Sequence, residues 1–412
     1  MTCCALSFFF FRGKLPPSPF CTSTFDPATA YISVDFHLVD NRDPFIYKTT
    51  DFGKSWKPIM GNLPKHSLSY VRAITEDPNC QGLPFTGTGN GLYYSLDDGG
   101  HWTALDSGLP LAPVTWAVVQ KEFHDLVIST YGRGLYILDD IAPLEQLAKT
   151  HSDAATVLFE LRQAYRFTRG GQAHLTFSLK TAPKDPVEIE ILNADERVIR
   201  KLKAKARAGM NRVKWDLRYE PPRLVALRTA APENSHIWNE TRFRDSDSRP
   251  ITHWGAKPAE VGPIVAPGAY SVRLKVEGQT YVQPVTVLRD PRSPGSESDI
   301  KASVKTLLRI SDDITSVSAT VNQIEWLRKQ LEVIETMLRP PKEKERPVMG
   351  EEDEDFPEPE PAAEQSPDSP EAKRKAELLK TVEALDKKLQ AIEYKLVSPA
   401  LVNSDDKYFV EP

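Results

Sequence analysis

From position 30 onward, hydrophobic residues fall into short runs that alternate with polar residues and are separated by turn-forming residues. Alternation with a period of two is typical of strands that bury one face. The runs of the first group are residues 30–34, 44–49, 70–74, 83–87, 92–95, 114–119, 126–130 and 135–138. The pattern therefore predicts a first β region over residues 19–143.

A second group of strand-like runs begins near residue 155, after a linker at residues 144–154 that opens with a pattern suited to a short helix. These runs are residues 187–192, 198–199, 209–217, 267–276 and 281–287. Strands with period two at this spacing predict a β-sandwich over residues 155–292.

An insertion at residues 221–263 interrupts this second region and is too long for a simple loop. It contains Trp238, His253 and Trp254, which we expect to cover the sandwich, with a ligand surface as the alternative. Its arginines are diluted by acidic neighbours, so a solvated loop is the first interpretation and an anion-binding patch the second.

Towards the C-terminus the spacing of apolar residues changes to three and four, which is typical of a helix. One stripe, from Ile310 to Leu338, predicts a long helix over residues 296–338. A second stripe with heptad steps predicts a helix over residues 371–397. The two helices can pack as an antiparallel hairpin, and a partner helix from another chain is the alternative.

Three segments carry no pattern that could bury a core. Residues 1–18 are expected to be disordered or to reflect a misassigned start inside a longer protein, and residues 398–412 form a tail. Residues 339–370 hold eight prolines and an acidic run at 351–355, so we expect them to be disordered.

One motif, Ser/Thr-x-Asp-x-Gly-x-x-Trp, occurs twice in the first β region at an offset of 46 residues. Its residues are Thr49, Asp51, Gly53 and Trp56 in the first copy and Ser95, Asp97, Gly99 and Trp102 in the second. A period of this size suits a four-stranded repeat unit. A third, incomplete copy is offset by 43 residues, and it aligns Tyr136 with Tyr93 but lacks the tryptophan.

Each motif is expected to form a turn between two strands. Glycine allows a positive φ at the turn, and aspartate can accept hydrogen bonds from amides of the same turn. Both tryptophans are expected to fold back onto their sheet and to be buried. Because fold-level repeats recur where no chemistry occurs, we assign all eight motif residues a structural role rather than a catalytic or metal-binding one.

The two motifs resemble the Asp-boxes of the bacterial neuraminidase repeat. The runs at residues 45–56 and 132–140 are similar to repeats of bacterial proteins with a sortilin-type propeller, often labelled glycosyl hydrolase. The later strands resemble fibronectin type III or Ig-like modules. The resemblance implies a mainly β fold, with a partial β-propeller of about three blades, then a β-sandwich and a C-terminal helical hairpin.

The same resemblance implies that further blades exist elsewhere, because propellers close with four or more. We expect them upstream in a longer protein or on another chain. The family is generally exported, whereas the residues of this chain leave its localisation open.

Composition narrows the choice of partners. A net charge of −5 over 412 residues does not favour nucleic acid, and no apolar run is long enough to span a membrane. The four cysteines, Cys3, Cys4, Cys21 and Cys80, show neither a metal-ligand spacing nor a disulfide framework. We therefore expect no metal and no cofactor.

Catalysis would need more than the motif acids supply. A glycosidase requires two placed carboxylates, and the loose acids of the first region follow no motif: Asp35, Asp40, Asp43, Glu76, Glu122 and Asp125. A sialidase-like site would need an arginine cluster and a Tyr–Glu nucleophile, and no such pattern is evident. The sequence favours a non-catalytic binding or scaffold protein for a protein, peptide or glycan ligand. The alternative is a glycoside hydrolase whose active site lies mostly on absent blades.

Overall fold

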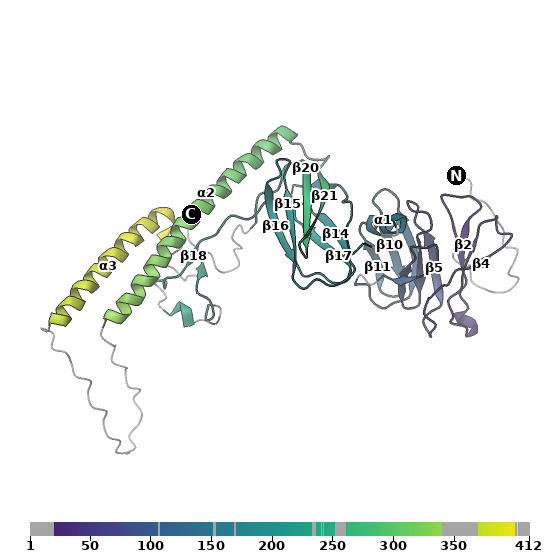
Figure 1. Ribbon diagram of the computed structural model, residues 1–412, viewed down its shortest axis with the longest axis horizontal. Helices are drawn as coiled ribbons and strands as arrows, with labels where there is room; N and C mark the ends of the chain where they lie inside the picture. The colour runs from purple at the N-terminus through teal and green to yellow at the C-terminus, as the bar shows by residue number, and fades with distance from the viewer. Residues whose placement is uncertain are drawn as a thin grey trace, which may run out of the picture. The chain divides into compact units, whose positions relative to one another are not determined.

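The protein is described from a computed structural model, which is mainly β with several antiparallel sheets and C-terminal helices (Figure 1). The described residues are 20–105, 108–150, 154–168, 170–232, 236–239, 241, 243–251, 261–339, 370–399 and 402. The expectations for residues 1–18, for His253 and Trp254, and for most of segments 339–370 and 398–412 lie outside them. No helix in these ranges is long and apolar enough to cross a membrane.

The chain divides into two compact units. Unit 1 comprises Met1–Ala164, Gln172–Trp215 and Ala269–Thr286, and unit 2 comprises Tyr165–Gly171, Asp216–Gly268 and Val287–Pro412.

Unit 1 begins with three antiparallel sheets in which strands follow one another along the chain. Sheet 1 contains β1 (Phe20–Thr22), β2 (Ala30–Ser33), β3 (Ile46–Thr49) and β4 (Lys57–Pro58). Sheet 2 contains β5 (Val71–Glu76), β6 (Pro84–Thr88), β7 (Gly91–Tyr94) and β8 (Thr103–Ala104). Sheet 3 contains β9 (Val114–Gln120), β10 (Asp125–Thr130) and β11 (Gly134–Leu138). Each strand-like run expected before residue 140 contains a strand.

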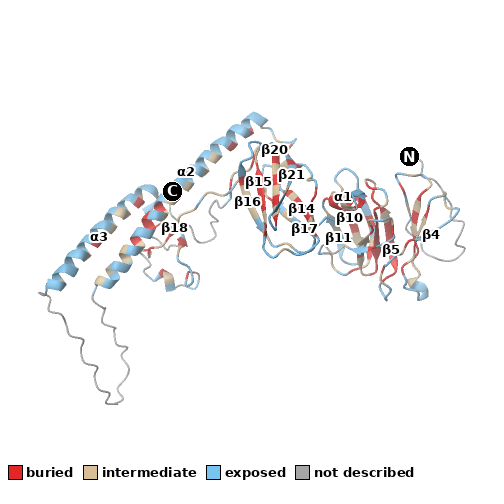
Figure 2. Cartoon of the chain, in the orientation of Figure 1, coloured by how far each residue is buried: buried red, intermediate tan, exposed pale blue. Residues whose placement is uncertain are grey.

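The three sheets stack face to face in chain order, and their shared faces form the core. Between sheets 1 and 2 the buried cluster is Tyr31, Ile46, Ile59, Leu63, Val71, Ile74 and Trp102. Between sheets 2 and 3 it includes Leu83, Phe85, Leu92, Val114, Ala117, Val119, Leu126 and Ile128. Figure 2 shows these buried positions along the strands. The short helix α1 (Ala142–Thr150) follows sheet 3 and adds Leu144 and Ala148 to the second cluster.

Two further sheets follow, and the strand-like runs expected after residue 187 lie in them. One has the order β12 (Thr156–Leu158), β14 (Ala173–Leu179), β17 (Gly209–Trp215). The other has the order β13 (Ala164–Arg166), β21 (Gln279–Arg289), β20 (Gly268–Val276), β15 (Val187–Leu192), β16 (Val198–Ala204). The buried Trp215 of β17 meets Tyr270 of β20 edge to face, with ring centroids 5.6 Å apart, so this contact joins the two sheets.

In unit 2, helix α2 (Glu297–Leu338) begins at a capping box, in which Ser296 and Asp299 each accept the other's backbone N–H. It packs against α3 (Pro370–Leu396) and against β18 (Ala226–Leu227), which pairs with β19 (Arg249–Pro250). The remaining elements are two 3-10 turns, η1 (His37–Val39) in unit 1 and η2 (Ile237–Asn239) in unit 2. Trp238 of η2 packs with Ala231, Ile237 and Phe243, and Lys329 of α2 lies over its ring.

The helix pair is joined by charged groups as much as by the expected apolar stripes. Arg328 of α2 is buried and donates to Asp386 at 2.9 Å and to Glu393 at 2.6 Å, both on α3. Glu325, also buried, accepts from the Thr229 amide and hydroxyl at 2.9 Å each.

Much of the apolar stripe on both helices remains exposed (Figure 2). Its exposed members include Ile310, Ile314, Val317, Leu327, Ile334, Leu378, Leu385 and Ile392. The buried residues of α3 are Val382 and Glu393, and Glu393 is one of the two carboxylates to which Arg328 donates.

Candidate functional site

The first motif turn, residues 49–56, is held by the Asp51 carboxylate. This carboxylate accepts from the Ser55 amide at 2.9 Å, the Ser55 hydroxyl at 2.6 Å and the Thr49 hydroxyl at 2.8 Å. These bonds, led by that from the Ser55 hydroxyl, lower the pKa of Asp51 to about 2. Gly53 follows with φ +82°, a conformation that side chains resist.

The second motif turn, residues 95–102, repeats the arrangement. Asp97 accepts from the His101 amide at 2.7 Å and the Ser95 hydroxyl at 2.8 Å. Burial opposes its ionisation, but the bonds from His101 and Ser95 outweigh burial and lower the pKa of Asp97 to about 2. Both motif carboxylates are therefore ionised acceptors that their own turns engage.

The second turn also packs against the preceding repeat. Trp102 is 4% exposed, and its indole Nε1 donates to the Ile59 carbonyl at 2.8 Å. Its backbone N–H donates to Asn62 Oδ1 at 2.6 Å, while the Asn62 amide returns a bond to the Trp102 carbonyl at 3.1 Å. A Cβ at Gly99, where φ is +91°, would lie 2.8 Å from Cβ of Ile59. The turn thus needs glycine for both conformation and space.

Trp56 was expected to be buried like Trp102, but its side chain is 42% exposed. Trp102 owes its burial to residues 59–63, which precede it by about one repeat. At the 46-residue offset the corresponding support for Trp56 would be residues 13–17, which lie outside the described residues. Both copies fit the same motif pattern, but the environments of their tryptophans differ.

A Tyr–Glu pair does occur, between sheets 1 and 2. The Tyr31 hydroxyl lies 3.0 Å from Glu76 Oε1 and 2.9 Å from Asp98 Oδ1, and Lys48 also pairs with Asp98. Burial, followed by the charges of Glu76 and Asp98, raises the pKa of Tyr31 far above its ordinary value. With 0% exposure, this phenol is a structural hydrogen-bond donor between two sheets rather than a nucleophile.

A second titratable cluster joins sheets 2 and 3 to α1. His124 Nδ1 lies 2.6 Å from Glu145 Oε1 and 3.1 Å from the Asn79 amide nitrogen. Asp77 is fully buried beside them, and its Oδ1 accepts from the Asn79 backbone N–H at 2.7 Å. Burial, then the charge of Glu145, raises the pKa of Asp77 to about 7.

This cluster predicts a pH-dependent stability. A carboxyl whose folded pKa lies above its unfolded value favours folding at low pH, and that contribution is lost as pH rises through the folded pKa. We expect the urea midpoint of unit 1 to fall between pH about 5 and about 8. In Asp77→Asn this fall should be clearly smaller, because the amide does not ionise.

The matched control for this titration is Asp125→Asn, a change at a half-buried carboxylate at the start of β10. The assignment is wrong if Asp77→Asn leaves the pH dependence unchanged, or if Asp125→Asn removes it equally.

The turns of sheets 1–3 lie at two ends of the strands, and the end away from the motif turns has a different character. We call it the loop end: residues 34–45, 64–70, 89–90, 108–113 and 131–133. Within sheet 2 the Gly89 amide donates to the Tyr70 carbonyl at 3.0 Å, and within sheet 3 the Tyr131 amide donates to the Pro113 carbonyl at 2.8 Å, so these loops extend the pairing of their own sheets. His37 stacks on the Tyr70 ring at 4.8 Å.

The loop end exposes large apolar side chains beside arginines. The exposed apolar residues are Leu38, Val39, Leu68, Leu111 and Tyr131. Arg42 donates to the Ser67 carbonyl at 3.4 Å, and Arg72 lies over Tyr70 and 3.5 Å from Asp35. This end therefore combines apolar contact area with fixed polar groups.

The loose acids do not assemble into a pair suited to glycoside cleavage. Asp35 is engaged by His37 and Arg72, and Glu76 by Tyr31. Asp125 accepts from the Asp140 amide at 3.0 Å and from Arg162 at 3.1 Å. Within the described ranges, no group of three His, Cys, Asp or Glu side chains could hold a metal ion.

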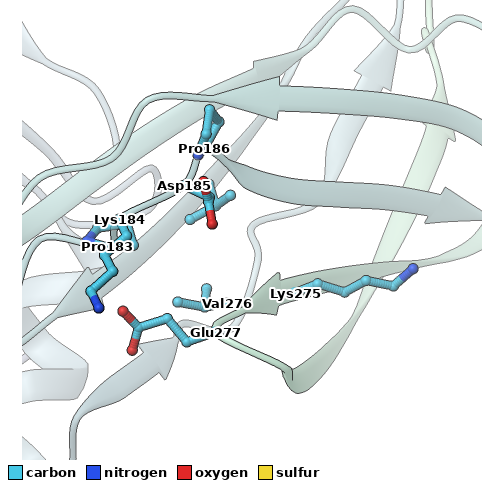
Figure 3. Close-up of a pocket in the computed structure, with 8 residues that line it drawn as sticks. Pro183, Lys184, Asp185, Pro186, Lys275, Val276 and Glu277 are labelled. Carbon is cyan, nitrogen blue, oxygen red and sulfur yellow. The ribbon is translucent and has the colours of Figure 1, made fainter.

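A hollow in the second β region is a weaker candidate (Figure 3). It has a volume of about 480 Å³ and is lined by residues 183–187 and 275–277. Lys184 and Asp185 stand at its rim beside Glu277, with no aromatic residue in the lining. Mixed charge on an exposed loop gives this hollow no defined ligand.

Comparisons with known proteins add little. No family model matches the chain, and no curated protein matches it. Among solved structures, the GH74 enzyme of Niastella koreensis aligns with a TM-score of 0.25 and 15% identity, over 39% of this chain and 26% of that one. The BSP domain of a biofilm associated protein aligns with a TM-score of 0.18 and 9% identity, over 68% of this chain and 30% of that one.

The chain therefore spans less than a third of the length of either structure. The geometry of the site places the motif residues, among them exposed Phe52 and Trp56, at one end of the sheets and exposed Leu38, Val39, Leu68, Leu111 and Tyr131 at the other. The loop end was missed in the sequence because its members come from five separate connections.

Proposed function

We propose that sheets 1–3 are consecutive blades of a β-propeller, and that the protein is a non-catalytic binding or scaffold protein whose loop end receives a protein or peptide ligand. One observation carries this proposal: Leu38, Val39, Leu68, Leu111 and Tyr131 are all exposed and all belong to connections at the loop end. Clustered apolar side chains with polar neighbours are typical of interaction surfaces.

The state of the acids supports a binding role over hydrolysis. Asp51 and Asp97 are held ionised by their own turns, and the Tyr31–Glu76 pair is buried. A general acid for glycosides needs a raised pKa and access to substrate. Asp77 has the raised pKa but is fully buried.

Selection of phage-displayed peptides on the full chain tests the binding role. We expect apolar peptides to be enriched, and the double variant Leu111→Ser, Tyr131→Ser to weaken their binding by about tenfold or more, since central aromatic and apolar contacts dominate interfaces. Phe52→Ser is the control, because Phe52 is also largely exposed but lies in a motif turn.

Equal loss in the Phe52 control would contradict the loop-end assignment. An assay with aryl glycosides and sialosides covers the hydrolase alternative. Turnover that disappears on a single carboxylate substitution, such as Glu76→Gln, would overturn the binding proposal.

A further inference from the structure

The outer face of sheet 3 is apolar and bare. Trp116 and Val118 of β9 and Leu135 and Ile137 of β11 lie on it, and all four side chains are exposed. The register places them on one face, because Val127 of β10 pairs with both Val118 and Ile137. The opposite face packs on sheet 2. These five residues are uncharged, and Asp125, which lies on the same face at the start of β10, is paired with Arg162. An apolar area of this kind is unusual on a free sheet face.

The repeat shows what normally covers this face. At the 43-residue offset, Leu135 and Ile137 of β11 correspond to Leu92 and Tyr94 of β7. In sheet 2 those two residues pack against sheet 3, and Leu92 is only 3% exposed, whereas Leu135 is 74% exposed. The bare face of sheet 3 therefore corresponds to the face of sheet 2 that packs against the next sheet.

Sheet 1 has the complementary face, on which Phe20 is exposed and Ile32 and Tyr47 are half-buried. Phe20, Ile32 and Tyr47 are directly opposite one another on β1, β2 and β3, on the face away from Tyr31 and sheet 2. Tyr47 corresponds to Tyr93 at the 46-residue offset, and Tyr93 packs against the sheet that precedes it. Sheet 1 thus presents the surface that a preceding sheet would cover.

We propose that these two faces bind each other between two copies of the chain, sheet 3 of one against sheet 1 of the other. This inference rests on the propeller part of the proposed function. Within one copy the two faces are opposite ends of the same stack of sheets. Two copies related by a two-fold axis cover all four faces and give six stacked sheets, within the four to eight blades that closed propellers use.

Sedimentation velocity of the full chain over a range of concentrations tests this arrangement. We expect a dimer. Ile137→Lys on sheet 3 and Tyr47→Lys on sheet 1 should each weaken dimerisation by at least about tenfold, because each puts an unpaired charge into an apolar interface. The control is Val282→Lys, which changes an exposed valine on β21 and should leave the dimer unchanged.

Because the proposed dimer joins two different faces, the two variants distinguish it from other assemblies. Pairing of sheet 3 with sheet 3 would leave the Tyr47→Lys variant dimeric, and open head-to-tail addition would give larger polymers; either result overturns the proposal. So does a monomer at all concentrations, or a dimer that neither variant affects. Peptide binding at the loop end, measured on the Ile137→Lys variant, shows separately whether the proposed function holds.

Discussion

Replacing Trp102 with alanine will lower the free energy of unfolding of unit 1 by roughly 3–5 kcal/mol, the range seen when large core side chains are truncated. The ring is 4% exposed and packs with Ile59, Leu63 and Val71 in the core between sheets 1 and 2. The change also leaves the Ile59 carbonyl without its indole donor. Urea unfolding followed by circular dichroism measures the loss.

Trp56→Ala is the matched control for this prediction. Trp56 occupies the same motif position and is the same residue, but its side chain is 42% exposed. We expect its substitution to cost clearly less than that of Trp102. Similar losses for the two variants would show that the motif itself, rather than the neighbouring repeat, determines how the tryptophan contributes.

The second large effect is expected at Arg328, where substitution by methionine should destabilise the helix pair of unit 2 by about 3–5 kcal/mol. Methionine keeps much of the volume but removes the charge. Glu393 and Glu325, both 0% exposed, would then remain buried without their cation. Burial and the charge of Glu325 already raise the pKa of Glu393, whereas Arg328 lowers it. Thermal loss of the helical circular dichroism signal measures the effect.

Arg309→Met on the same helix is the control, since Arg309 is exposed, and we expect it to change stability by less than about 0.5 kcal/mol. Adding Glu393→Gln to Arg328→Met should recover part of the loss, because it removes one of the uncompensated charges. If Arg328→Met is neutral, the charged cluster does not hold the helices together.

Sequence periodicity predicted many of the strands and both long helices, because these depend on local alternation and on spacing along the chain. It gave no run for β12, β13 or β14, although β14 is the central strand of its sheet. The 46-residue offset also located the two motif turns correctly between strands, as β3–β4 and β7–β8. The burial of Trp56 could not be predicted, because the support for a motif tryptophan comes from the preceding repeat.

The polar networks were missed for a related reason. Tyr31, Glu76 and Asp98 come from positions 45 and 67 residues apart, so no local pattern connects them. For Arg328 the sequence contains a weak indication of burial. Glu325 and Arg328 follow Val321 at helical spacing, so both face the buried side of α2. A charged pair in phase with an apolar stripe indicates a buried ion pair when the facing helix supplies carboxylates, as α3 does here.

The central claim is that consecutive repeats stack so that Trp102 is seated on the segment joining sheets 1 and 2. Oxidation of tryptophan by N-bromosuccinimide, read out residue by residue with mass spectrometry, tests it directly. We expect Trp102 to be protected while Trp326, which is half exposed on α2 and serves as the internal reference, reacts readily. Oxidation of Trp102 at the rate of Trp326 in the folded protein would contradict the stacking of the repeats.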